Sequence, residues 1–238
     1  MTLSPDTIVY WRLGPLAINA TLVFTWLVMA LLVGVAAVVR SRMRLDGGMS
    51  PAQNALEALV AFILDQIRDV TQQDPDPYLP FVGTLFLFIA TSNVLSVVPG
   101  FQPPTGSLTT TAALAICVFL AVPAFGIARL GLVPYLRGYL QPSPFMLPFT
   151  IIGELSRTLA LAVRLFGNVM STTVIVAILL SVAPLLFPVI MNAFGLLIGV
   201  IQAYIFAILS IVYIASGTTQ QMREHSSRTH DEGQGGSS

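Results

Sequence analysis

The chain is dominated by long apolar stretches that contain no charged residue. Three such stretches stand out: residues 13–39, 77–128 and 165–222. The hydrocarbon core of a bilayer is about 30 Å thick and takes roughly 20 helical residues, so the first stretch predicts one membrane span, residues 15–39. The second predicts two spans, residues 79–98 and 109–133, because a loop rich in Pro and Gly at 99–106 divides it. Helices are expected, since these runs are too long for barrel strands.

The apolar sequence of the C-terminal half predicts two helices that are too long to cross a bilayer upright. Residues 145–186 contain breakers only near their ends, at Pro148 and Pro184. A continuous helix of that length would measure about 60 Å, and residues 188–216 would add a helix of about 43 Å. Both lengths exceed the hydrocarbon thickness. We therefore expect a long, strongly tilted helical hairpin.

The segment 50–72 predicts a different kind of helix. Its apolar residues recur at helical spacing, while the residues between them are polar or charged. The apolar positions are Leu56, Leu59, Val60, Ile63 and Ile67, and the polar ones include Asp65, Arg68 and Asp69. This pattern is typical of an amphipathic helix on the membrane surface.

Composition restricts the class of protein. Of 238 residues only 22 are charged, 11 acidic and 11 basic, which is 9 % against about 25 % in soluble domains. This scarcity argues against a soluble enzyme, a nucleic-acid binder and a disordered protein. The single cysteine, Cys117, excludes a disulfide framework and a multi-cysteine metal site. The sequence thus predicts an all-α polytopic membrane protein with about five membrane-embedded helices and one amphipathic surface helix.

We expect one membrane domain, residues 1–220, followed by a disordered cytoplasmic tail, residues 221–238. His225 and His230 lie in this polar tail and are read as solvated side chains, so no metal ion and no cofactor is expected. Five crossings place the two termini on opposite sides. One side would carry eight arginines and the other only Arg12. The eight are Arg40, Arg42, Arg44, Arg68, Arg129, Arg137, Arg223 and Arg228. By the positive-inside rule the N-terminus lies outside and the C-terminus in the cytoplasm.

Three charged residues remain inside the predicted hairpin: Glu154, Arg157 and Arg164. Glu154 and Arg157 lie near its cytoplasmic start, where an interfacial pair or snorkelling side chains would explain them. Arg164 lies deeper, and an Arg at the membrane centre costs at least about 2.5–3.5 kcal/mol. Glu154 lies about 80° around the helix and roughly 15 Å along it, too far to neutralise Arg164. We therefore expect a functional Arg164 whose partner is on another chain or in transit.

Polar residues accompany Arg164 along one face of its helix. Arg157, Arg164, Asn168 and Ser171 are spaced so that they form one stripe, whereas Thr173 points to the opposite side.

The second helix of the hairpin carries a matching stripe of Gly195, Gln202 and Tyr213, where ordinary interhelical hydrogen bonding is the simplest alternative explanation. Gly195 and Gly199 form a small-xxx-small pair that allows another helix to approach closely. Two polar stripes on neighbouring tilted helices resemble the wall of an ion route.

Three separated motifs resemble subunit a of the rotary F-type ATP synthases. They are Gly153-Glu154-Leu155-Ser156-Arg157 followed by Arg164-Leu165-Phe166-Gly167-Asn168, then Ile201-Gln202-Ala203-Tyr204-Ile205-Phe206 with Tyr213, and Asn93, Pro99 and Pro103-Pro104-Thr105. The resemblance extends in order over residues 51–213, most of the chain.

This resemblance implies a non-catalytic stator subunit with two half-channels. These would carry protons to and from a carboxylate on the rotating c-ring and so couple ion flow to rotation. Arg164 would separate the half-channels. Channel or supporting roles would fall to Asn168, Gln202, Glu154, Tyr213, Arg157, Ser171, Thr172 and Thr173. The implied partners are the c-ring, the peripheral-stalk b subunits and the lipid of a bacterial-type inner membrane, with no nucleic acid and no bound nucleotide.

The sequence departs from the family pattern at several positions. Many members have a carboxylate where this chain has Thr173, and an acidic residue or His where it has Gly195. Ser96, Thr158, Ala160 and Ala162 also differ from common residues. One half-channel thus lacks its usual titratable relay, and water chains lined by Ser171, Thr172 and Thr173 could substitute. A sodium-translocating version of the same machine remains an alternative.

Two other classes fit the sequence less well. A secondary transporter predicts inverted repeats and broken helices near the membrane centre, and neither is evident here. A structural scaffold leaves Arg164 unexplained. No Gly-rich phosphate-binding loop is present, so the chain is not expected to bind ATP itself.

Overall fold

The computed structural model describes residues 9–13, 16–42, 51–72, 74–98, 100–133, 135, 146–182 and 187–234. Within these ranges it has six α-helices, which confirms the predicted all-α membrane fold. The helices are α1 (Ala20–Arg42), α2 (Pro51–Thr71), α3 (Leu79–Leu95), α4 (Leu108–Leu130), α6 (Met146–Val182) and α7 (Phe187–Gln234). A short 3-10 helix, η2 (Pro104–Gly106), precedes α4. Among these described helices, four are long and apolar enough to cross a membrane, over Ala20–Ser41, Leu108–Arg129, Pro148–Ser181 and Val189–Ser216.

Several element boundaries differ from the prediction, most clearly at the start of the first span, the end of the second and the end of the last helix. Residues 15–19 were expected in the first span, but β2 (Leu16–Asn19) pairs antiparallel with β1 (Val9–Leu13), so α1 begins at Ala20. The β-branched and aromatic residues of β1 favour such a strand. The helix α3 ends at Leu95 rather than at residue 98, because the chain turns before Gly100, whose φ is positive.

At the other end, the backbone of α7 continues as helix to Gln234. It therefore extends into residues 221–234, where the sequence predicts a disordered tail. The first residues of this segment, Gln221, Met222, Arg223 and Glu224, are good helix formers and favour continuation of the preceding helix.

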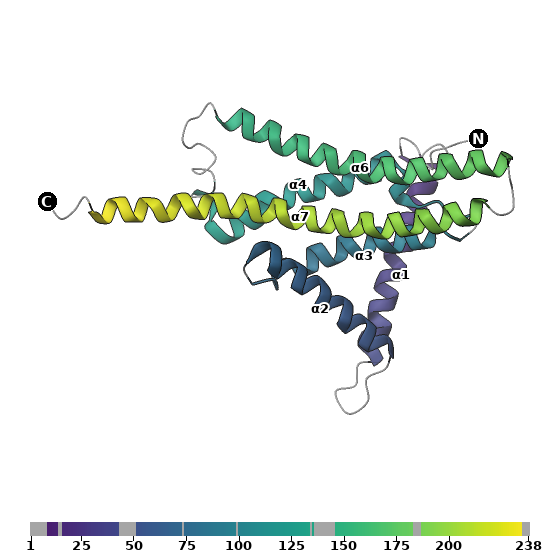
Figure 1. The fold of residues 1–238 in the computed structure, drawn as a ribbon, viewed down its shortest axis with the longest axis horizontal. Helices are drawn as coiled ribbons and strands as arrows, with labels where there is room; N and C mark the ends of the chain where they lie inside the picture. Colours follow the sequence, from purple (N-terminus) through teal and green to yellow (C-terminus); the bar gives the residue numbers. More distant parts are fainter. Residues whose placement is uncertain are drawn as a thin grey trace.

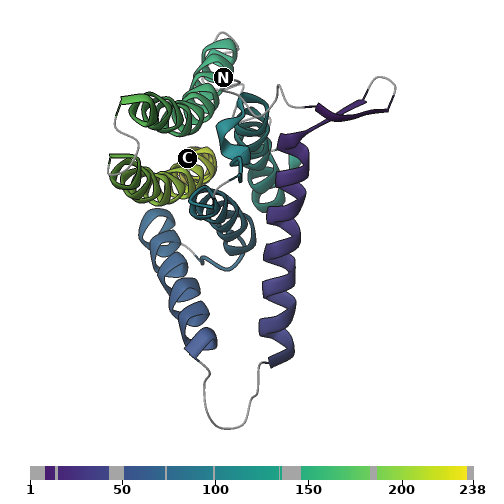
Figure 2. The same ribbon diagram turned by 90° about the vertical axis from the view of Figure 1, so that its right-hand side faces the viewer.

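Four helices share one direction, α1 runs across them, and α2 lies obliquely (Figure 1). In Figure 1, α3, α4, α6 and α7 run alongside one another while α1 runs across them, and Figure 2 shows the same four helices end-on. The 23 residues of α1 measure about 34 Å, the length of one upright span. The 37 residues of α6 measure about 56 Å, and α6 packs beside α7. If α1 crosses the bilayer upright, α6 and α7 form the predicted inclined hairpin.

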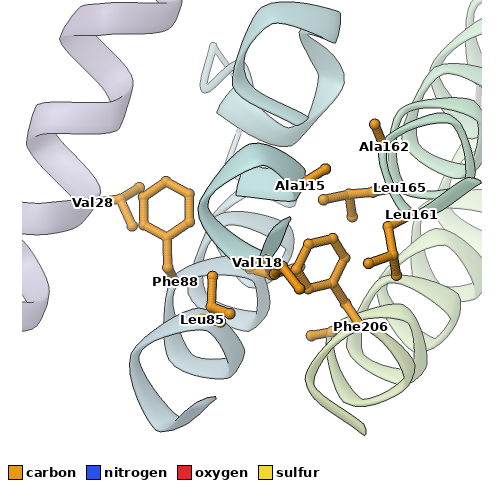
Figure 3. Close-up of a cluster of buried hydrophobic side chains, with 11 residues drawn as sticks. Val28, Leu85, Phe88, Ala115, Val118, Leu161, Ala162, Leu165 and Phe206 are labelled. Atoms are coloured by element: carbon orange, nitrogen blue, oxygen red, sulfur yellow. The ribbon is translucent and has the colours of Figure 1, made fainter. Parts of the chain in front are cut away.

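Two apolar clusters hold the helices together. The first joins α1, α3, α4, α6 and α7 (Figure 3) and includes Val28, Phe88, Val118, Leu165 and Phe206. The second attaches α2 to the bundle.

In this second cluster Ile63 and Ile67 of α2 are buried against α3, α4 and α7, while Asp65 and Arg68 face outward and form an exposed ion pair of 3.9 Å. A hydrogen bond of 2.5 Å from the Tyr204 hydroxyl to Gln66 Oε1 also links α7 to α2. The amphipathic pattern of α2 thus serves packing against the bundle.

Candidate functional site

Arg164 lies at the middle of α6, on a helix that the core holds in place. Its neighbours Leu161 and Leu165 are only 1 % and 0 % exposed and pack in the first apolar cluster (Figure 3). Arg164 itself is exposed on the outside of the bundle. Among the described residues no carboxylate lies within ion-pair distance of its guanidinium. This agrees with the expectation that Glu154 does not neutralise it.

A cavity of about 210 Å³ lies on the C-terminal side of Arg164 along α6. Its walls come from the C-terminal end of α3, the loop before η2, α6, and the start of α7. They contain Asn93, Ser96, Val97, Phe101, Gln102, Pro103, Asn168, Val169, Thr172, Thr173, Val176, Asn192, Gly195 and Gly199. We call this the first cavity. It brings together the predicted channel residues Asn168, Thr172 and Thr173 of α6 with Gly195 and Gly199 of α7.

Two buried hydrogen bonds of the Asn93 side chain hold the wall of the first cavity together. Asn93, 4 % exposed, donates from Nδ2 to the carbonyl oxygen of Gly199 over 2.8 Å. Its Oδ1 accepts a hydrogen bond of 3.1 Å from Thr105 Oγ1. The side chain of Asn93 therefore fixes α3, α7 and η2 relative to one another.

A second, smaller cavity of about 20 Å³ lies on the N-terminal side of Arg164. Its walls come from α4, α6 and α7 and contain Val118, Phe119, Val122, Glu154, Arg157, Thr158, Tyr213 and Ser216. The guanidinium Cζ of Arg157 lies 5.7 Å from the centre of the Tyr213 ring, within the range of a cation–π contact. The second cavity thus unites Glu154, Arg157 and Tyr213 from the sequence-based set.

Three predicted residues line neither cavity, namely Arg164, Gln202 and Ser171. Gln202 of α7 is only 6 % exposed, and its Nε2 has no hydrogen-bond partner among the described residues. On α7, Gln202 lies between Gly199, which lines the first cavity, and Tyr213, which lines the second. Arg164 has the corresponding position on α6, between the residues that line the two cavities. Ser171 is exposed. Thr173, although placed opposite Arg164 on the helix, still reaches the first cavity together with Asn168.

Sequence reasoning did not select Asn93, Gln102 and Asn192 as site residues, although all three line the first cavity. Each is a polar residue within or beside an apolar stretch. That signal marks them as unusual, but whether their side chains meet in one cavity depends on how α3 and α7 pack.

Comparisons with known proteins agree over almost the whole chain. The family model described as "ATP synthase A chain" matches residues 22–215. A protein of Acaryochloris marina named "ATP synthase subunit a 2" is 58 % identical over 232 residues, which cover 98 % of this chain and 98 % of that protein. A protein of Picosynechococcus sp. with the same name is 59 % identical, covering 95 % and 97 %. "ATP synthase subunit a 1" of Chlorobaculum parvum is 56 % identical, covering 92 % and 96 %.

Proposed function

The chain belongs to the ATP synthase A chain family, and on this basis we propose that it is the stator of the membrane sector, with two half-channels that carry protons to and from the c-ring. It is an integral membrane protein and an ATP synthase subunit that serves ion transport. In this role it does no nucleotide chemistry itself. It couples ion flow to rotation, and thereby to synthesis or hydrolysis of ATP elsewhere in the complex.

The observation that carries the proposal is the position of the two cavities along α6. The second cavity reaches Thr158 and the first begins at Asn168, a separation of about 15 Å along the helix axis, with Arg164 between them. In this proposal, an ion that moves from one cavity to the other passes the level of Arg164 along α6. A fixed cation there opposes direct leakage of cations between the two routes.

Arg164 also supplies the chemistry of exchange. A carboxylate on the rotor must be neutral while it faces lipid, because an unpaired charge there is costly. Beside Arg164 its ionised form is stabilised, so the carboxylate releases its ion. Arg suits this role because it stays protonated at any physiological pH. The exposed position of Arg164, among the apolar side chains of α6, suits a c-ring helix as its partner. We propose the b subunits as further neighbours.

The positive-inside rule sets the direction of the two routes. With the N-terminus outside and the C-terminus in the cytoplasm, the first cavity faces the outer side of a bacterial-type inner membrane and the second faces the cytoplasm.

Labelling of introduced cysteines tests this arrangement. After replacement of the exposed Cys117 by Ser, we expect Asn192→Cys to react with a membrane-impermeant thiol reagent added outside. Thr158→Cys should react only with reagent added from the cytoplasmic side. The buried Ala162→Cys, located between the cavities, should react from neither side. Labelling of positions 192 and 158 from the same side would contradict two opposed half-channels.

A separate measurement identifies the ion. For proton coupling, ATP-driven pumping by the reconstituted complex should continue at its full rate in Na⁺-free buffer at fixed pH. Pumping that stops without Na⁺, and returns when Na⁺ is added, would assign the sodium-translocating alternative. The Arg164 mechanism holds for either ion, because both would leave an ionised carboxylate on the rotor.

A further inference from the structure

The two cavities differ in chemistry as well as in size. The second has an acidic, a basic and a phenolic side chain in its walls, namely Glu154, Arg157 and Tyr213. Every residue in the wall of the first cavity is neutral and non-titratable. Its polar groups are amides and hydroxyls, contributed by Asn93, Ser96, Gln102, Asn168, Thr172, Thr173 and Asn192.

The parts of α3, α6 and α7 that form the first cavity add no acidic residue within the described ranges. The helix α3 has no charged residue, and α7 has none between Phe187 and Ser216. The loop Phe101–Pro103 and η2 are likewise uncharged. On α6 the nearest charged residue is Arg164, one turn before Asn168, and it is permanently protonated.

The first cavity has the size and polarity to hold water. A cavity holds a water molecule when it offers about 10–15 Å³ of such space and two to four polar partners, and about 210 Å³ with several amides and hydroxyls exceeds this requirement. One atom in the wall has an unfilled hydrogen-bonding position that a water molecule could fill. Gln102 Oε1 is buried and has no hydrogen-bond partner among the described residues, although buried acceptors are nearly always paired.

Packing explains why position 195 carries no side chain. A Cβ added to Gly195 would lie 2.5 Å from Cγ2 of Thr172, closer than side chains approach one another. The hydroxyl of Thr172 is bonded to the carbonyl oxygen of Asn168 over 3.1 Å, which holds this side chain against α7. Thr172 thus occupies the space that the Cβ of a titratable side chain at position 195 would need.

We propose that the first cavity is a half-channel of ordered water held by neutral amides and hydroxyls, through which the ion passes without being taken up by a titratable side chain of the described cavity wall. This inference rests on the proposed function and deepens it. It makes the two half-channels unequal, because among the described lining residues the ionisable side chains belong to the cytoplasmic cavity. Asn168, Thr172, Thr173 and Asn192 act by binding water and by setting the width of the route.

The pH profile of ATP-driven pumping by the whole reconstituted complex tests the proposal. Asn192→Leu removes a water-binding amide without adding a charge, and it should lower the pumping rate about tenfold, because water loses a hydrogen-bond partner along the route. The loss should be equal at every pH, so that the shape of the profile matches the wild type. A changed shape would show a titratable group in series with the cavity and would overturn the proposal.

A second pair of variants places a carboxylate in the route on purpose. Thr173 is exposed and lines the first cavity, so Thr173→Glu should fit where a residue at 195 does not. It should add a new ionisation step to the pH profile, and its uncharged match, Thr173→Gln, should lack that step. Equal profiles for Glu and Gln, with Asn192→Leu reducing the rate, would overturn the neutral-route proposal while leaving the half-channels in place. Wild-type rates in all three variants would show that the cavity is not the route, and the outer half-channel itself would fail.

Discussion

Replacement of Arg164 by Ala is expected to abolish ATP-driven ion pumping by the reconstituted complex while the complex still assembles. The side chain is exposed and, among the described residues, has no ion-pair partner, so its removal leaves no buried group unsatisfied. Exposed substitutions of this kind usually change stability by no more than about 0.5 kcal/mol. Transport should be lost because the rotor carboxylate no longer has a cation that stabilises its ionised form.

Arg164→Lys should also lose pumping. This variant tests whether position 164 needs only a positive charge or a positive charge that is never lost. A lysine ammonium can lose its proton where it is desolvated, whereas the guanidinium stays charged. The ammonium also presents a single point of charge instead of a planar fork of donors. Recovery of wild-type pumping in the Lys variant would show that any cation suffices at this position.

The matched control for Arg164→Ala is Arg68→Ala. Arg68 lies on α2 and forms only an exposed ion pair with Asp65, and such surface pairs contribute about 0–1 kcal/mol. Pumping and assembly should therefore persist in the Arg68 variant. Normal pumping in Arg164→Ala, with the subunit present in the complex, would contradict the assignment of Arg164 as the group that separates the half-channels.

The long helices and the isolation of Arg164 could be predicted from sequence because both follow from local rules. The lengths of residues 145–186 and 188–216 exceed one bilayer thickness whatever surrounds them, and α6 and α7 occupy most of these ranges. The helical repeat alone predicts that Glu154 is too far along the helix to neutralise Arg164.

The composition of the two cavities could not be predicted in this way. Thr173 points away from Arg164 on a helical wheel, yet it shares the first cavity with Asn168 because the loop Phe101–Pro103 and the start of α7 extend the wall around α6.

The β1–β2 hairpin was not predicted either, because it too depends on a contact between separate segments. Pairing with another strand outweighed the apolar pattern that favours a longer first helix.

The contact between α3 and α7 depends on a glycine. A Cβ added to Gly199 would lie 2.9 Å from Cβ of Asn93 and 3.0 Å from its Cγ. Asn93 cannot move aside freely, because its amide donates to the carbonyl oxygen of Gly199 itself and accepts from Thr105. The two helices must therefore separate, or the buried hydrogen bonds of Asn93 must break, to admit even one methyl group.

Gly199→Ala should accordingly destabilise the subunit by about 1–3 kcal/mol, the usual cost of overpacking a close contact. The effect should appear as a lower thermal midpoint of the purified complex and as less of this subunit retained in it. Gly83→Ala on α3 is the matched control, because a Cβ there meets nothing within 4 Å and Ala is favoured over Gly in a helix by about 0.5–1 kcal/mol. An unchanged thermal midpoint for Gly199→Ala would mean that α3 and α7 can separate at little cost. The hydrogen bonds of Asn93 would then not be what fixes the wall of the first cavity.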